Sequence, residues 1–341
     1  MGSFFLFYNF RININDNYFL HFYSALKKIS NFVKNNKVKN TKNISEMVES
    51  DQIMEQRNKP TSKVKSYISF TKLRLSALVI VSALSGYLFV GGHDLIQITY
   101  LVLGGFLVTA ASNGSNQIWE KDLDKLMKRT QNRPLPQNEM SLKESYFVVI
   151  FCLISGLVLL YQLNFTTAIL GLLSYVLYVF IYTPMKRISP WAVFIGAFPG
   201  AMPPMLGAIA HTNEFGLIPG VLFFVQFIWQ FPHFWAIAWV VFDDYKAGGF
   251  SLLPSKEGKC KASAFQIVAY AFLLIPFSLL PWLLGWTGIA TLIIGTIASA
   301  WFFWYAYKLF LTTDDKDAKK LMFASFLYLP VIQFLYVFDK I

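Results

Sequence analysis

Residues 191–240 read WAVFIGAFPGAMPPMLGAIAHTNEFGLIPGVLFFVQFIWQFPHFWAIAWV, two long apolar runs separated by the short polar break HTNE. Each run, 191–211 and 217–240, has about the 20 residues that an α-helix needs to cross a bilayer. Neither run shows the alternating hydrophobicity of a membrane β-strand. The stretch therefore predicts two transmembrane helices joined by a tight turn. The first of them should be kinked and closely packed because of its prolines and glycines: Gly196, Pro199, Gly200, Pro203, Pro204 and Gly207.

The same pattern extends in both directions along the chain. Apolar runs of spanning length lie at 73–90, 95–115, 145–163, 165–183, 191–211, 217–240, 266–285, 288–311 and 321–338. Of the 341 residues, 55% are hydrophobic and 14% are charged, whereas about 25% charged residues is usual in soluble domains. This composition excludes a soluble enzyme, a disordered protein and a disulfide scaffold. The predicted fold class is an all-α integral membrane protein with nine transmembrane helices.

The basic residues distinguish the two sides of the predicted bundle. With a cytoplasmic N-terminus, 29 of the 30 Lys and Arg residues fall on the N-terminal side, and only Lys340 lies opposite. The opposite loops, GGHD, QLN, HTNE and GWTG, carry none. Cytoplasmic loops of membrane proteins are enriched in Lys and Arg. The net charge of +11 is therefore interpreted as a sign of membrane orientation, and no nucleic-acid partner is predicted.

The first 65 residues differ from the rest of the chain. They are rich in Asn and Lys, and residues 33–63 are polar without a helical or strand pattern. We interpret residues 1–65 as a flexible polar arm on the cytoplasmic or matrix side, and residues 66–341 as the membrane domain. Two alternatives stay open. In the first, the arm is a transit peptide, although its scarcity of Arg argues against this. In the second, the gene start is placed too early and Met54 is the initiator.

Two inner loops, 116–144 and 241–265, are longer than simple connections require, and both carry acidic residues. The first contains Asn116, Glu120 and Asp124, which on a helix line an amide and two carboxylates along one face. Such oxygen donors suit Mg²⁺, which takes further ligands from a substrate phosphate. The basic residues that follow suit the phosphate itself: Lys128, Arg129 and Arg133. The alternative is a solvated interfacial helix with ordinary ion pairs.

The second long loop is entered through FPHFWAIAWVVFDDYKAGGFSLLP, residues 231–254. Asp243 and Asp244 stand where the apolar run ends, and Tyr245 and Lys246 follow. Adjacent acids at the end of an apolar helix are costly unless they are solvated or ligated. Alone they indicate only a helix end that reaches water. Together with the first acidic loop, they predict magnesium ions around one diphosphate.

Four motifs in this order resemble those of the UbiA-type prenyltransferase superfamily, and within it the branch of the protoheme IX farnesyltransferases. The motifs are NQIWEKDLDKLMKRTQNRPLP, YTPMKRISPW, GAFPGAMPPMLGAIA, and WQFPHFWAIAW with DDYKAGGFSLLP. The resemblance runs from about Ser66 to the C-terminus. It implies nine helices around a central cavity that opens to the cytoplasmic side and laterally to lipid.

The resemblance also assigns residues. The family's first acidic motif falls on Asn116, Glu120 and Asp124, with Glu where the pattern usually has Asp. Its second falls on Asp243-Asp244-Tyr245, where the wider superfamily has two Asp four residues apart. Its Lys-Pro-Arg appears without the proline, as Lys72-Leu73-Arg74. The implied metal ligands, which also form the catalytic set, are Asn116, Glu120, Asp124, Asp243 and Asp244. The implied substrate-binding residues are Lys72, Arg74, Lys128, Arg129, Arg133, Lys186, His233, Tyr245 and Lys246.

The implied activity is transfer of the farnesyl group of farnesyl diphosphate to a vinyl group of haem b. The products would be haem O, for the maturation of haem–copper oxidases, and diphosphate. Mg²⁺ would be the cofactor, and haem b a substrate. The other implied partners are membrane lipid and a downstream haem-modifying enzyme of the same membrane. We expect a bacterial inner membrane, with the mitochondrial inner membrane as the alternative.

His233 lies within an apolar run, directly after Pro232. Titratable groups inside spans are usually functional. A neutral imidazole here could contact haem, or it could donate to a backbone carbonyl freed by the proline, and both interpretations stay open.

Two other functions are the alternatives for the whole chain. A quinone or other aromatic prenyltransferase would normally carry the spaced second Asp pair. A transporter or a haem-handling protein would show broken helices around a site at the middle of the membrane.

Overall fold

The computed structural model describes residues 62–341, so most of the predicted arm, residues 1–61, lies outside the described part. The described chain is built from helices. In chain order they are α2 (Lys63–Thr71), α3 (Leu73–Phe89), α4 (Leu95–Trp119), α5 (Lys121–Asp124), α6 (Leu142–Tyr161), α7 (Phe165–Val176), the π-helical turn η1 (Leu177–Tyr182), α8 (Thr183–Met185), α9 (Ala192–Thr212), α10 (Leu217–Val240), α11 (Phe242–Ala247), α12 (Lys261–Ser278), α13 (Leu280–Leu283), α14 (Ile289–Thr312) and α15 (Asp315–Phe338).

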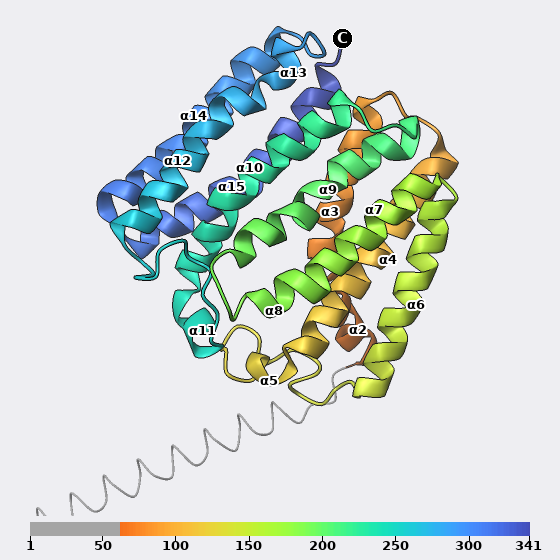
Figure 1. The fold of residues 1–341 in the computed structure, drawn as a ribbon, viewed down its shortest axis with the longest axis vertical. Coiled ribbons are helices and arrows are strands. Elements are labelled where there is room, and N and C mark those ends of the chain that lie inside the picture. The colour runs from red at the N-terminus through yellow and green to blue at the C-terminus, as the bar shows by residue number, and fades with distance from the viewer. Residues whose placement is uncertain (1–61) are drawn as a thin grey trace, which may run out of the picture. The chain divides into compact units, whose positions relative to one another are not determined.

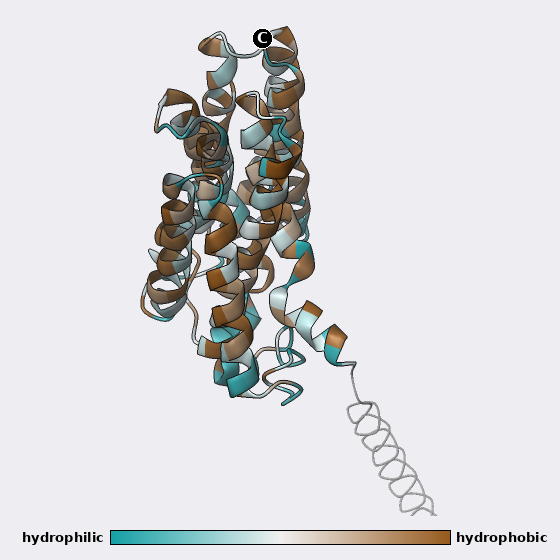
Figure 2. Ribbon diagram, turned by 90° about the vertical axis from the view of Figure 1, so that its right-hand side faces the viewer, coloured by the Kyte–Doolittle hydropathy of each residue, from teal (hydrophilic) through white to brown (hydrophobic). Residues whose placement is uncertain are grey.

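The number of spans agrees with the prediction from sequence. Within residues 62–341, eight helical segments are long and apolar enough to cross a membrane, and the bent pair α2–α3 makes a ninth if it is counted as one span. Large apolar side chains are exposed along the outer faces of the helices, for example Phe147, Phe151 and Ile154 of α6. A surface of this kind is stable only against lipid. Figure 2 shows hydrophobic residues along most of the helix lengths, with hydrophilic residues gathered toward the lower end of the view.

The bend between α2 and α3 is made by Lys72. The two helices meet at 43°, and Lys72 adopts a left-handed conformation with φ of 49°. That conformation is uncommon for a residue other than glycine. The chain therefore bends at this point although Leu73 stands where the family's pattern has proline.

Small residues allow the central helices to approach closely, as the composition of residues 191–211 predicts. A Cβ atom added to Gly207 of α9 would lie 1.7 Å from the carbonyl oxygen of Ala83 in α3. One added to Gly86 of α3 would lie 1.9 Å from the carbonyl oxygen of Pro204 in α9. The prediction of close packing for this helix is confirmed, because only glycine fits where two helix backbones touch.

The short connecting helices gather at one end of the bundle. Figure 1 shows α5 and α11 together at the lower end, whereas α13 and the C-terminus lie at the upper end. α5 belongs to the first long acidic loop and α11 to the second. The fold therefore brings both loops to the same end of the spans.

Candidate active site

The first acidic motif keeps its helical register although the helix is interrupted. α4 ends at Trp119, and Glu120 forms the junction with the single turn α5. The Glu120 N–H donates to Asn116 O at 3.0 Å, and the Asp124 N–H donates to Glu120 O at 2.7 Å. The three side chains therefore follow one another at one-turn intervals, as predicted. All three are buried, with 2%, 4% and 0% of their surfaces exposed.

Asn116 is oriented by a residue that the sequence analysis did not single out. Its Nδ2 donates to Thr183 Oγ1 at 3.4 Å, and Thr183 Oγ1 donates to Tyr178 O at 2.8 Å. Thr183 directly follows η1. π-helical turns are rare in proteins, and those that occur are often found at functional sites. Thr183 lies within the YTPMK stretch of the second motif, which was the available signal.

Glu120 is neutralised by Lys186, which follows α8. Lys186 Nζ forms an ion pair with Glu120 Oε1, and both side chains are buried. The same ammonium group faces the rings of Tyr182 and Phe250, 5.2 Å and 5.1 Å from their centres. The Ser251 N–H donates to Lys186 O at 3.0 Å. Lys186 thus joins the first acidic motif to Phe250 and Ser251, which follow the second acidic motif. Its contacts with the aromatic rings are strengthened by its burial, because cation–π contacts are stronger when the cation is desolvated.

Asp124 is neutralised by Arg133. The Arg133 guanidinium donates from one nitrogen to both carboxylate oxygens, at 2.8 Å and 2.7 Å. Burial raises the pKa of Asp124, and the neighbouring Arg133 opposes that rise. The hydroxyl of Thr130 donates to Asp124 O at 3.1 Å and so closes the loop between the two residues.

The second acidic motif is tied to the first loop by Asp244. Its two carboxylate oxygens accept the backbone N–H groups of Lys128 and Arg129, each at 3.2 Å. The Arg129 guanidinium lies 5.8 Å from the centre of the Tyr245 ring, and burial raises the pKa of that phenol. Asp243 is exposed. Asp244 therefore brings the two acidic loops into contact, and the magnesium site predicted between them stays a prediction.

The remaining predicted basic residues are not equally close to this cluster. Lys72 interacts electrostatically with Glu120, Arg133 and Lys186, so the bend between α2 and α3 brings it to the site. Arg74 and Lys246 are exposed, and their side chains form no ion pair within residues 62–341. Lys128 contributes its backbone, and its side chain is exposed.

His233 lies apart from the acidic cluster. It stands on α10, about 15 Å along the chain from Asp243 at 1.5 Å per helical residue. Its Nδ1 lies 2.7 Å from Ser325 Oγ of α15, and its ring stacks on Trp229 at 4.2 Å between centres. Nδ1 is therefore paired with a neighbouring helix, and not with the carbonyl freed by Pro232. Its part in binding a substrate stays a prediction.

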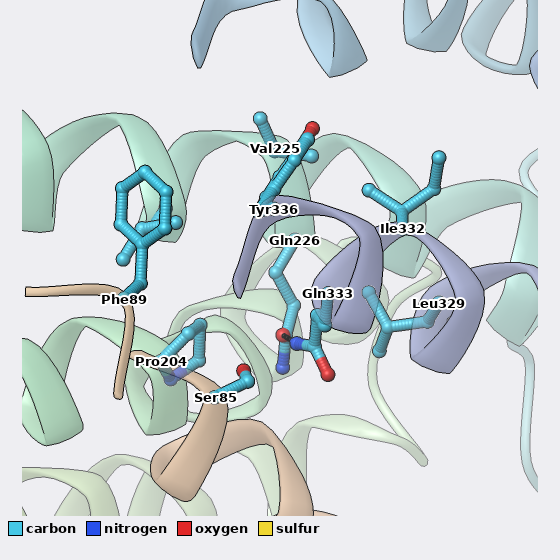
Figure 3. Close-up of a pocket in the computed structure, with 10 residues that line it drawn as sticks. Ser85, Phe89, Pro204, Val225, Gln226, Leu329, Ile332, Gln333 and Tyr336 are labelled. Carbon is cyan, nitrogen blue, oxygen red and sulfur yellow. Dashed lines mark hydrogen bonds between the residues drawn. The ribbon is translucent and has the colours of Figure 1, made fainter. Parts of the chain in front are cut away.

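A second polar cluster lies deeper in the bundle, among α3, α9, α10 and α15. Pro204 has no N–H for the carbonyl of Gly200. The side-chain amides of Gln226 and Gln230 supply the missing donors, at 2.7 Å and 2.8 Å. The chain continues because Gln333 Nε2 donates to Gln226 Oε1 at 2.7 Å. Figure 3 shows Gln226, Gln333 and Pro204 around a small cavity at this point. These amides supply the hydrogen bonds that the kinked helix lacks, and Gln230 and Gln226 lie about 20 and 25 Å along the chain from Asp243 at 1.5 Å per helical residue.

The donor chemistry at the acidic motif fits a hard divalent cation, but only in combination with another ligand. Mg²⁺ takes one or two carboxylates and completes its shell with water or phosphate oxygens. Glu120, Asp124 and the Asn116 carbonyl oxygen are suitable donors, but Lys186 and Arg133 engage both carboxylates. Among residues 62–341, no three His, Cys, Asp or Glu side chains converge on a point that would hold a metal unaided.

Comparison with known proteins identifies the relatives of this chain. The model of the UbiA prenyltransferase family matches residues 79–329. A protoheme IX farnesyltransferase of Cytophaga hutchinsonii is 46% identical over 283 residues, which cover 82% of this chain and 99% of that protein. One of Flavobacterium psychrophilum is 45% identical, covering 79% and 92%.

Solved structures share the fold at low sequence identity. A structure from a study of digeranylgeranylglyceryl phosphate synthase has a TM-score of 0.68 and 20% identity, covering 82% of this chain and 99% of that one. A UbiA homologue from Archaeoglobus fulgidus, bound to DMAPP and Mg²⁺, has a TM-score of 0.57 and 16% identity, covering 80% and 99%. The family match and the near-complete coverage of the bacterial relatives lead to one conclusion: this chain is an integral membrane protein of the UbiA prenyltransferase family.

Proposed function

We propose that this protein transfers the farnesyl group of farnesyl diphosphate to a vinyl group of haem b, forming haem O and diphosphate. The observation that carries the proposal is the identity of 44–46% to three proteins named protoheme IX farnesyltransferase, over 79–83% of this chain. Those proteins come from bacteria, which supports a bacterial inner membrane as the location.

The geometry of the acidic cluster supports a diphosphate as the donor's leaving group. Lys186, Arg133 and Lys72 bring positive charge to one end of the spans, next to Glu120 and Asp124. A diphosphate needs both kinds of residue, because cations bind its oxygens and carboxylates hold its metal ion. The structure of the Archaeoglobus fulgidus homologue with DMAPP and Mg²⁺ supports the same class of ligand.

Asn116, Glu120 and Asp124 would hold Mg²⁺, with Asp243 and Asp244 as the second acidic motif. When bound, the metal would supply positive charge that stabilises the leaving diphosphate. Lys186 and Arg133 would stabilise the same charge as the allylic C–O bond breaks and its electron pair stays on oxygen. Water has to be kept from the reacting carbon until the vinyl group has formed the new C–C bond, and the apolar surroundings of the spans would serve this purpose. One water then adds to the resulting cation and loses a proton, which gives the hydroxyl group of haem O.

The test is a reaction of the purified protein in detergent with haem b, farnesyl diphosphate and Mg²⁺, followed by mass analysis of the haem. We expect a haem product heavier by one farnesyl group and one water, less one proton. Glu120→Gln is the matched negative control. A haem that stays unmodified while an aromatic acceptor such as 4-hydroxybenzoate becomes prenylated would overturn the acceptor and leave a prenyltransferase of another specificity.

A further inference from the structure

Each buried carboxylate of the acidic motif is already paired with a cation of the chain's own, Lys186 being buried and Arg133 partly buried. Lys186 pairs with Glu120, and their side chains are 9% and 6% exposed. Arg133 pairs with Asp124, and their side chains are 15% and 0% exposed. The Lys125–Asp122 pair in the same loop is different, because its side chains are 47% and 84% exposed. Among the ion pairs of residues 62–341, those of Glu120 and Asp124 are the least exposed to water.

The two cations are held in place by the fold. The Lys186 ammonium faces the rings of Tyr182 and Phe250, and the Ser251 N–H donates to the Lys186 carbonyl. Arg133 reaches both oxygens of Asp124. The backbone N–H of Arg133 donates to Thr130 O at 3.0 Å, and the Thr130 hydroxyl in turn donates to Asp124 O. The burial and ring contacts of Lys186 and the two hydrogen bonds of Arg133 therefore hold both cations at their carboxylates.

This arrangement opposes the binding of a metal ion alone. A carboxylate that takes up a metal releases its ammonium or guanidinium partner, and an unpaired buried charge is strongly unfavourable. A diphosphate removes the difficulty, because its oxygens can accept Lys186 and Arg133 while the carboxylates turn to the metal. Each ligand therefore favours the other, and such coupling is reciprocal.

We propose that the site takes the metal and the diphosphate together, with Lys186 and Arg133 serving as internal counter-ions that weaken the binding of either ligand alone. This inference rests on the proposed function, since it concerns the same site. It adds that the free protein binds a free divalent metal ion weakly, and that the counter-ions exchange partners when the prenyl diphosphate binds.

The experiment measures Mn²⁺ binding by the loss of its free-ion electron paramagnetic resonance signal. Full-length protein in detergent is titrated alone and with farnesyl thiolodiphosphate, an unreactive analogue, and the analogue without protein corrects for complexes in solution. We expect the wild-type protein to bind Mn²⁺ at least about tenfold more tightly with the analogue, within the range usual for coupled sites. Equal affinity with and without the analogue would overturn the inference, and this comparison needs no variant.

Lys186→Met tests the counter-ion directly. It frees Glu120, so Mn²⁺ alone should bind more tightly than in the wild type, while the analogue should bind more weakly and the coupling should fall. Lys125→Met, which removes a cation from the exposed pair in the same loop, should leave the wild-type coupling in place. A folded Lys186→Met protein with unchanged Mn²⁺ binding would contradict the role of Lys186. If that variant does not fold, Lys186→Gln is measured in its place.

Haem farnesylation by the same wild-type preparation separates the two proposals. Protein that makes haem O but binds Mn²⁺ equally well alone keeps the proposed function and loses the counter-ion inference. Protein that shows coupled binding but leaves haem unchanged keeps the inference and loses the proposed acceptor.

Discussion

Gly207 of α9 lies directly against the backbone of α3, and replacing it with alanine tests how tightly these central helices pack. The added Cβ atom would lie 1.7 Å from the carbonyl oxygen of Ala83, whereas ordinary van der Waals contact begins at 3.4 Å. The helices would have to separate by about 1.7 Å at this point, because a carbonyl within a helix cannot rotate away as a side chain can. Overpacking typically costs 1–3 kcal/mol, and with a backbone obstacle we expect about 3 kcal/mol.

The assay is thermal unfolding of the purified protein in detergent, with Gly220→Ala as the matched control. Gly220 lies in α10, and no atom of another residue falls within 4 Å of a Cβ atom added there. The unfolding entropy is about 2.1 cal/mol/K per residue, or about 0.6 kcal/mol/K for the folded part of this chain, so each 1 kcal/mol lowers the Tm by about 1.7 °C and Gly207→Ala should lower it by about 5 °C. Gly220→Ala should leave the Tm unchanged or raise it slightly, since alanine favours a helix over glycine. Equal Tm values for the two variants would refute the close contact of α3 and α9.

Three further predictions concern function and topology. Glu120→Gln should abolish turnover while the protein is still expressed, because the proposed metal ligand, which is also the ion-pair partner of Lys186, loses its charge, whereas Lys121→Gln on a neighbouring face should matter much less; equal losses would indicate general damage to the loop. His233→Ala should weaken haem b binding, followed by spectral titration, and spare farnesyl diphosphate binding; an unchanged haem spectrum and affinity would remove this residue from the acceptor site. Reporters fused within 125–140 and after Ile341 should fall on opposite sides of the membrane, and the same side for both would contradict the predicted topology.

Local patterns in the sequence determined the helices and the motif register. The length of each apolar run was enough to predict the spans, because a helix in lipid satisfies its backbone hydrogen bonds within its own segment. The spacing of Asn116, Glu120 and Asp124 was likewise enough to align them, since hydrogen bonds between residues four apart continue through the junction at Glu120. These features depend on residues within one or two helical turns.

The partners of those residues were decided only by the tertiary structure. Lys186 meets Glu120 and Asp244 meets the backbone of Lys128 and Arg129 across long stretches of chain, whereas Arg74, which the family motif placed with them, is exposed. The same holds for His233 with Ser325 of α15. Apolar runs specify that helices form but not which faces meet. In a membrane, those faces are selected by the close packing of small residues and by the pairing of buried polar groups. Both involve residues that lie far apart in the sequence.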